Sequence, residues 1–253
     1  MTRSIAEAPT WRDGYRRDVA TLAAHQKSRR GAPPYSLLVN RPLGRRLAAV
    51  AHGLGMSPNA VSLLSASLSA LGLVLLAFVE PSVVTSTLVV LLLLVAYAVD
   101  SADGQLARLV SGGTLAGEWL DHSLDMVKMA SFHAAILVSA VRFDRSMGDW
   151  PAATAIAFGI VAVTLFFVMI LTDQLRRQAG GTAPVRSGSP WFLVAVAPTD
   201  YGVQCLWLLV RPQSTVFFAG YLLLAVLNLG YLGIGAVSRF TELQRLDRER
   251  GAS

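Results

Sequence analysis

Residues 99–129 read "VDSADGQLARLVSGGTLAGEWLDHSLDMVKM", and this stretch joins two long apolar segments of the chain. The segment before it, "VVTSTLVVLLLLVAYA" (residues 83–98), carries no charged side chain and is typical of a membrane-spanning helix. Four aspartates lie at the end of this predicted helix and the start of the next: Asp100, Asp103, Asp121 and Asp125. A carboxylate at bilayer depth costs roughly 2.5–3.5 kcal/mol on insertion scales, so four together indicate a functional site.

The composition of the whole chain agrees with a membrane protein. Its 253 residues are 53% hydrophobic and 15% charged, with a mean hydropathy of +0.50. Soluble domains carry about 25% charged residues. The single cysteine, Cys205, excludes an internal disulfide and a thiolate metal cluster. The first 50 residues are polar and basic, so we expect no cleavable signal peptide.

Six apolar segments predict six transmembrane helices and an all-α integral membrane fold. The segments lie near residues 59–79, 83–107, 115–141, 152–175, 191–210 and 215–237. The linkers between them contain glycine, proline or charged residues, as expected where a helix leaves the membrane. We therefore expect a juxtamembrane segment (1–50), a six-helix domain (51–240) and a short C-terminal tail (241–253).

The basic residues predict the orientation of these helices. Of the 22 lysines and arginines, ten precede the first predicted span, one follows the second, three follow the fourth and four follow the last. The opposite side has only Arg142, Arg145 and Arg211. The excess of positive charge predicts that both termini and the aspartate-rich stretch face the cytoplasm. The composition, rich in Ala, Leu, Val and Arg, suits a bacterial inner membrane.

The N-terminal segment contains a candidate amphipathic helix. Trp11, Tyr15, Val19 and Leu22 recur at helical spacing, while neighbouring arginines point elsewhere. This pattern is typical of a helix that lies in the headgroup region against anionic lipid. The alternative is a basic tail that only sets the orientation of the chain.

The spacing of the four aspartates places them on two facing helix surfaces. Asp100 and Asp103 are three residues apart, and Gly117, Asp121 and Asp125 follow at intervals of four, so each set shares one helix face. The short linker "VSGGT" makes the two helices antiparallel neighbours, so both acidic faces can meet. Converging carboxylates repel one another unless cations neutralise them.

Hard divalent cations with oxygen ligands, such as Mg²⁺, Mn²⁺ or Ca²⁺, suit such a cluster better than zinc does. Cations of this kind commonly serve phosphate groups, and Arg108 is placed to join them. The residues alone therefore predict a metal-dependent site for phosphoryl chemistry. The alternative from another class is a cation transporter or channel that uses the aspartates as an ion site.

The stretch resembles the sequence motif of the CDP-alcohol phosphotransferase (phosphatidyltransferase) family. Written D-x2-D-G-x2-A-R-x8-G-x3-D-x3-D, the motif matches residues 100–125 at each of its eight fixed positions. The matching residues are Asp100, Asp103, Gly104, Ala107, Arg108, Gly117, Asp121 and Asp125. A weaker likeness covers "VNRPLGRRLAAVAHGLGMSPNAVS" (residues 39–62), where the family has an Asn-Arg segment and a Pro-Asn start to its first span.

This resemblance implies transfer of a phosphoalcohol from a CDP-alcohol to a second alcohol, with release of CMP, in phospholipid synthesis. It implies two divalent ions, Mg²⁺ or Mn²⁺, on the carboxylates of Asp100, Asp103, Asp121 and Asp125. It implies a CDP pocket shaped by Asp103, Gly104, Ala107, Arg108, Gly117 and Asp121. Asp125 is the candidate general base, and the alternative is that it only binds metal. The resemblance also implies a homodimer, membrane lipid as a partner and no nucleic acid.

Four further residues are candidates with a structural alternative each. His122 could act as an auxiliary base, or it could only pack beside the metal ligands. Lys128 could contact a phosphate of donor or acceptor, or it could balance the local negative charge. Arg176 and Arg177 could bind an acceptor phosphate, or they could anchor a helix end at the membrane surface.

The identity of the two alcohols stays open at this point. Within the family, one branch pairs a CDP-diacylglycerol donor with a polar acceptor, and another pairs a polar CDP-alcohol with a lipid acceptor. A third branch joins CDP-inositol to inositol phosphate. The segment "GEWLDHSLD" (residues 117–125) resembles the second branch, whereas "NRP" (residues 40–42) is similar to the inositol-phosphate enzymes.

Overall fold

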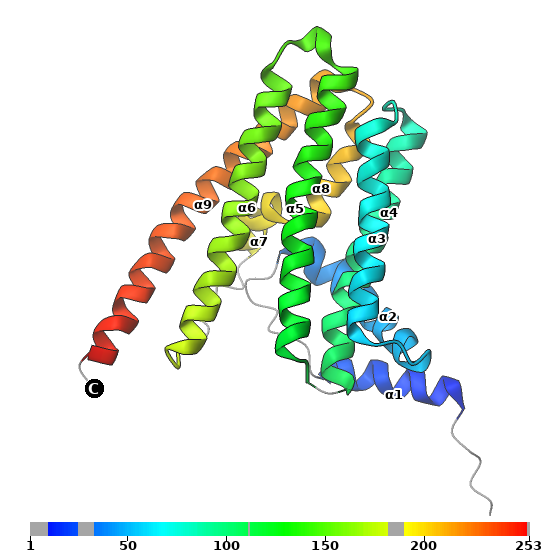
Figure 1. The fold of residues 1–253 in the computed structure, drawn as a ribbon, viewed down its shortest axis with the longest axis vertical. Helices are drawn as coiled ribbons and strands as arrows, with labels where there is room; N and C mark the ends of the chain where they lie inside the picture. Colours follow the sequence, from blue (N-terminus) through cyan, green and yellow to red (C-terminus); the bar gives the residue numbers. More distant parts are fainter. Residues whose placement is uncertain (1–9, 25–32, 111, 182–189, 252–253) are drawn as a thin grey trace, which may run out of the picture.

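The computed structural model describes residues 10–24, 33–110, 112–181 and 190–251, which form helices, turns and short connections (Figure 1). Arg186, one of the basic residues used to predict the orientation, lies outside these ranges, as do the basic residues before Thr10 and between Ala24 and Pro33.

Among the described residues, five helices are long and apolar enough to cross a membrane. They are α3 (Pro58–Phe78), α4 (Val83–Val110), α5 (Leu115–Phe143), α6 (Trp150–Gln178) and α9 (Ser214–Gly251). A sixth segment of sufficient length and hydropathy, Trp191–Val210, is bent by 66° at a break between Thr199 and Tyr201. The prediction of an all-α membrane fold is confirmed, with the correction that the fifth predicted span is bent.

The break in this segment follows from two residues. Pro198 lacks a backbone N–H and lies in a short 3-10 turn, Ala197–Thr199, after α7 (Pro190–Val196). Asp200 follows in extended conformation and caps α8 (Tyr201–Trp207), because its side chain accepts a hydrogen bond from the backbone N–H of Gly202. The apolar run of residues 191–210 therefore forms two short helices.

The long helices pack as an antiparallel bundle in which α3 contacts both α4 and α5, and α6 lies between α5 and α9. The core is aromatic at the end of the bundle that carries the loops 79–82 and 144–149. There, rings from α5, α6 and α9 bury one another, including Phe132, Phe158, Phe217, Phe218 and Tyr221. This packing fixes the bundle at one end and leaves room for polar residues at the other.

The N-terminal part of the chain lies at that other end (Figure 1). The predicted amphipathic helix is α1 (Trp11–Ala24), which packs on α2 (Arg41–Gly53). Leu22 of α1 is buried, and Asp18 of α1 lies 2.6 Å from the imidazole Nδ1 of His52 in α2. A five-residue π-helical turn, Ser36–Asn40, leads into α2.

The last transmembrane helix extends further toward the C-terminus than predicted. Residues 241–251, which the sequence suggested as a short tail, continue α9 as helix. The last turns of α6 and α9 lie at the same end of the bundle as α1, α2 and the connection between α4 and α5 (Figure 1). The segments richest in arginine therefore gather at one end of the molecule.

Candidate active site

A polar cleft lies between α4 and α5, and the π-helical turn before α2 forms its third wall. Its volume is about 220 Å³. Three sets of residues line it: Asp100, Ser101, Asp103, Gly104, Gln105 and Arg108 with Tyr97 from α4, Asp121 and Asp125 from α5, and Ser36, Asn40 and Arg41 from the N-terminal side. The two acidic helix faces predicted from spacing therefore meet at one cavity.

The aspartates form two overlapping groups. Carboxylate oxygens of Asp100, Asp103 and Asp121 lie within 4.8 Å of one another. Side-chain ligand atoms of Asp121, His122 and Asp125 satisfy the same limit. Asp121 belongs to both groups. A set of carboxylate oxygens around a cavity fits Mg²⁺ or Mn²⁺, which prefer oxygen ligands.

Two serines of α3 hold the α4 carboxylates in place. The hydroxyl of Ser62 donates to Asp103 at 2.6 Å, and that of Ser65 lies 3.3 Å from Asp100. The backbone N–H of Gly104 also donates to Asp103. The sequence reading did not single out these serines. The available signal was the recurrence of serine at positions 62, 65 and 69, which share one face of α3.

Lys128 lies between two of the aspartates. Its Nζ is 2.6 Å from Asp100 and 2.8 Å from Asp125, and the side chain is buried. These ion pairs are those expected of a counter-charge, and a contact with a phosphate stays a prediction. The ammonium links α5 to α4 across the cleft, and it contacts one oxygen of each of these two carboxylates.

His122 lies on the α6 side of Asp121. Its Nε2 is 3.7 Å from Glu118 and its Nδ1 is 3.9 Å from Asp121. The imidazole ring meets the ring of Phe166 edge to face. The Nδ1 atom is buried and has no hydrogen-bond partner among the described residues. His122 therefore lies close to the carboxylates of Asp121 and Asp125, although it does not line the cleft.

The residues that the resemblance assigns to CDP divide into two sets. Gly104 and Arg108 line the cleft, and a Cβ atom built on Gly104 would meet only the Arg108 guanidinium, at 3.9 Å. Gly117 instead faces the start of α3, where an added Cβ would lie 3.4 Å from Asn59 and 3.1 Å from Thr114. Ala107, like Gly117, does not line the cleft. Gly104 therefore leaves space for a ligand beside Arg108, whereas Gly117 lets the start of α5 approach the start of α3.

The two arginines at the end of α6 make carboxylate contacts of their own. Arg176 lies 2.6 Å from Glu242 of α9 and 2.5 Å from Asp173, and Arg177 lies 2.9 Å from Glu118 of α5. Neither arginine lines the cleft. The contacts tie α6 to its two neighbours, α5 and α9. Both roles considered for these arginines, phosphate binding and anchoring at the membrane surface, stay predictions.

Three cleft residues come from a segment to which the sequence reading gave no site role. Ser36, Asn40 and Arg41 all lie before the first long helix, in or beside the "NRP" segment. The Asn40 side-chain oxygen is buried and has no hydrogen-bond partner among the described residues. Burial lowers the pKa of the Arg41 guanidinium from its usual value. This wall therefore adds a positive charge and a hydrogen-bonding group opposite the carboxylates.

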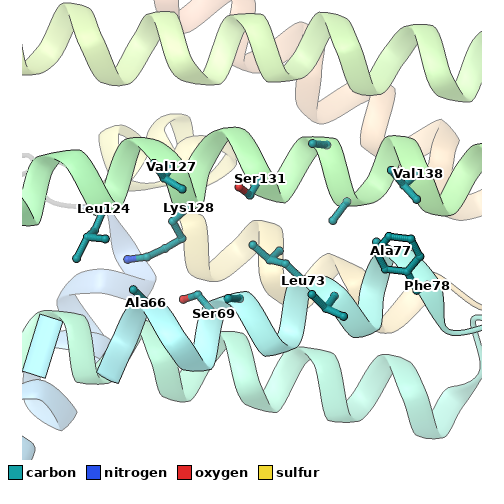
Figure 2. Close-up of a pocket in the computed structure, with 14 residues that line it drawn as sticks. Ala66, Ser69, Leu73, Ala77, Phe78, Leu124, Val127, Lys128, Ser131 and Val138 are labelled. Carbon is teal, nitrogen blue, oxygen red and sulfur yellow. The ribbon is translucent and has the colours of Figure 1, made fainter. Parts of the chain in front are cut away.

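An apolar groove begins on the other side of Lys128. It runs between α3 and α5 with a volume of about 320 Å³ (Figure 2). Leu73, Ala77 and Phe78 of α3 face Val127 and Val138 of α5 along it. Lys128 lines this groove and pairs with Asp100 and Asp125 of the acidic cleft, so the apolar surface adjoins the cleft.

A comparison with protein families finds a match to the greater part of the chain. A family model described as CDP-alcohol phosphatidyltransferase matches residues 55–232, which is more than half of the chain. The matched region includes α4 and α5 with all four aspartates. A search of curated proteins returns no match. The family match lends no support to the cation-transporter alternative.

Proposed function

We propose that this chain, which belongs to the CDP-alcohol phosphatidyltransferase family, uses the acidic cleft to transfer a phosphoalcohol from a CDP-alcohol to an acceptor alcohol. The observation that carries the proposal is the convergence of Asp100, Asp103 and Asp121 oxygens within 4.8 Å at a cleft of about 220 Å³. Lys128 pairs with two of the four carboxylates, and Arg41 and Arg108 line the same cleft, so acidic side chains outnumber basic ones there and divalent cations would balance the excess.

Asp100, Asp103, Asp121 and Asp125 would hold two ions, Mg²⁺ or Mn²⁺. Such ions, when bound, neutralise the charge of a diphosphate and polarise the phosphorus that is attacked. Arg108 and Arg41 line the same cleft and would attract the phosphate oxygens. Gly104 would let the nucleotide approach the α4 backbone, since among the described residues only the Arg108 guanidinium lies within 4 Å of a Cβ atom built there.

Asp125 would act as the general base. It lines the cleft, and Lys128 fixes its orientation through the contact of 2.8 Å. In the reaction, the acceptor oxygen forms a bond to phosphorus, the bond from phosphorus to the CMP oxygen breaks, and the hydroxyl proton moves to Asp125. His122, 3.9 Å from Asp121, is placed to support that carboxylate more directly than to reach the acceptor.

One of the two alcohols would be a lipid, in keeping with phospholipid synthesis. The apolar groove between α3 and α5 suits an acyl chain, because it adjoins the cleft at Lys128 and is lined mainly by apolar residues. We place the cleft and both termini on the cytoplasmic side of a bacterial inner membrane, since 18 of the 22 basic residues lie on that side. We propose a homodimer on family grounds.

The test is CMP release by the purified protein in lipid micelles. CDP-diacylglycerol, CDP-choline, CDP-ethanolamine and CDP-inositol are each offered with Mg²⁺ or Mn²⁺ and a panel of acceptor alcohols. We expect acceptor-dependent release that stops when the metal is chelated. Asp125→Asn should slow it by roughly 10²–10⁴-fold, the range for loss of a general base. Absence of both CMP release and metal-dependent CDP binding would overturn the proposal.

A further inference from the structure

Asp200 is a buried acid in the bent segment Trp191–Val210, outside the family motif. Its side chain is 1% exposed. One carboxylate oxygen accepts hydrogen bonds from the backbone N–H groups of Tyr35 at 2.8 Å and Ser36 at 3.1 Å. The other oxygen accepts from the N–H of Gly202 at 3.0 Å. Three backbone donors from two distant parts of the chain therefore meet one carboxylate.

The three donors lie at the starts of helical segments. The first N–H groups of a helix have no partner within it, and a carboxylate is the side chain best suited to satisfy them. Tyr35 and Ser36 open the turn that leads into α2, and Gly202 opens α8. Asp200 thus joins the N-terminal wall of the cleft to the break in the fifth span, 164 residues further along the chain.

A ring contact supports the same junction. The ring of Tyr35 lies against Gly202 so closely that a Cβ atom there would overlap it. The same ring stacks with Tyr97 at a centroid distance of 6.2 Å. Tyr97 itself lines the cleft. The carboxylate and the ring contact together fix both the backbone and the side chain of residue 35.

The segment held in this way carries the third wall of the cleft. Ser36, Asn40 and Arg41 line the cavity, and they follow the anchored N–H groups within two turns of helix. The oxygen of Asn40 is buried without a partner among the described residues, so a ligand that donates a hydrogen bond would satisfy it. A shift of the anchor would move these groups relative to the aspartates on α4 and α5.

We propose that Asp200 is a positioning residue that sets the Ser36–Arg41 wall for binding of the nucleotide part of the donor. The inference rests on the proposed function for the identity of the ligand, and on the hydrogen bonds of Asp200 for the anchor itself. Asp200 does not touch the reacting groups, because it does not line the cleft. Its loss should weaken ligand binding more than it slows the chemical step.

The first experiment measures the anchor directly. Amide hydrogen exchange is followed by mass spectrometry in the purified wild-type protein and in Asp200→Asn. Asparagine keeps one acceptor oxygen and turns an NH₂ group toward the backbone donors. We expect exchange in peptides covering residues 33–41 to accelerate by about tenfold or more, with α5 and α6 unchanged. Unchanged exchange at residues 33–41 would overturn the proposal.

The second experiment measures binding with CDP and Mg²⁺ as the probe. Isothermal titration calorimetry should give a Kd for CDP that rises about tenfold in Asp200→Asn, equivalent to about 1.4 kcal/mol. In turnover assays the KM for the CDP donor should rise by a similar factor while kcat stays within about threefold. A normal KM and Kd, with faster exchange, would show that the segment is not a binding wall.

Two further variants separate positioning from general damage. Gly202→Ala should displace the Tyr35 ring and reproduce the local exchange without altering the carboxylate. Gln204→Met is the matched control, since it removes the hydrogen bond to Pro198 in the same bent segment and leaves Tyr35 and Ser36 untouched. Equal effects of Gln204→Met and Asp200→Asn would overturn the proposal. If the wild type binds no CDP, the proposed function fails, while the exchange data still decide the anchor.

Discussion

The acidic cleft and the Arg211–Asp144 pair are two charge clusters in opposite halves of the same bundle. In the pair, one guanidinium meets one carboxylate, and both side chains are almost fully buried, at 1% and 4% exposure. Ser139 and Ser214 accept further hydrogen bonds from the guanidinium, and the rings of Phe217 and Phe218 lie about it. In the cleft, four carboxylates outnumber three basic side chains, those of Lys128, Arg41 and Arg108, around a cavity.

The difference separates a structural cluster from a functional one. The pair is balanced in charge and packed among aromatic rings, so it fastens the α8–α9 connection to α5. The cleft is unbalanced, open and lined by groups from three parts of the chain. An excess of carboxylates beside a cavity is typical of a site where a ligand supplies the missing charge. The comparison yields three predictions, the largest effect first.

Arg211→Met should have the largest effect, and it should fall on stability. The substitution leaves the Asp144 carboxylate buried without its partner, which costs about 3–5 kcal/mol. Thermal unfolding in detergent measures the loss. The double variant Arg211→Met with Asp144→Leu should recover much of it, because no buried charge then remains. Turnover by the folded fraction should stay near that of the wild type; a specific loss of kcat would contradict a purely structural pair.

Lys128→Met should have a smaller effect that depends on metal. Without the ammonium, Asp100 and Asp125 repel each other beside the cleft, and we expect a loss of about 1–3 kcal/mol in the presence of EDTA. Divalent cations should restore stability more strongly than they do in the wild type, because they can replace the missing charge. Equal stabilisation of both proteins by Mg²⁺ would contradict a counter-charge role.

The smallest effects should distinguish two glycines of the motif. Gly104→Ala places a methyl group in the cleft, so CDP affinity should fall about fivefold while stability holds or rises slightly, as alanine favours helix. Gly117→Ala should lower the stability and leave the CDP affinity unchanged, because its methyl group would crowd Asn59 and Thr114. Calorimetry with CDP and thermal unfolding give both values. A loss of CDP affinity confined to Gly117→Ala would contradict the assignment of the two glycines.

Much of the fold and the acidic site followed from local patterns. Long apolar runs predicted the five long helices, and the spacing of Asp100, Asp103, Asp121 and Asp125 predicted two acidic faces that meet. Both rest on the helical repeat, which a sequence shows directly.

The remainder depended on contacts between distant residues. Nothing near Lys128 in the sequence distinguishes a phosphate contact from a pair with Asp100, since Asp100 lies on another helix. Asp200 lies inside an apolar run and lacks the spacing of a motif, and its partners are backbone groups near residue 35. Pro198 and Asp200 together indicate a bend, but the apolar run of residues 191–210 is long enough for one span and was predicted as a single helix.

The most direct test of the central claim is a titration of the purified protein with Mn²⁺, followed by electron paramagnetic resonance. Asp121 belongs to both carboxylate groups, so Asp121→Asn should disturb both ions. We predict two bound Mn²⁺ per chain in the presence of CDP for the wild type. We predict a loss of affinity of at least about tenfold for Asp121→Asn, the lower bound for an outer partner of a metal ligand. The matched control Asp149→Asn, an exposed aspartate in the opposite loop, should bind like the wild type. Equal Mn²⁺ binding by wild type and Asp121→Asn would contradict the claim that this cleft holds the metal ions.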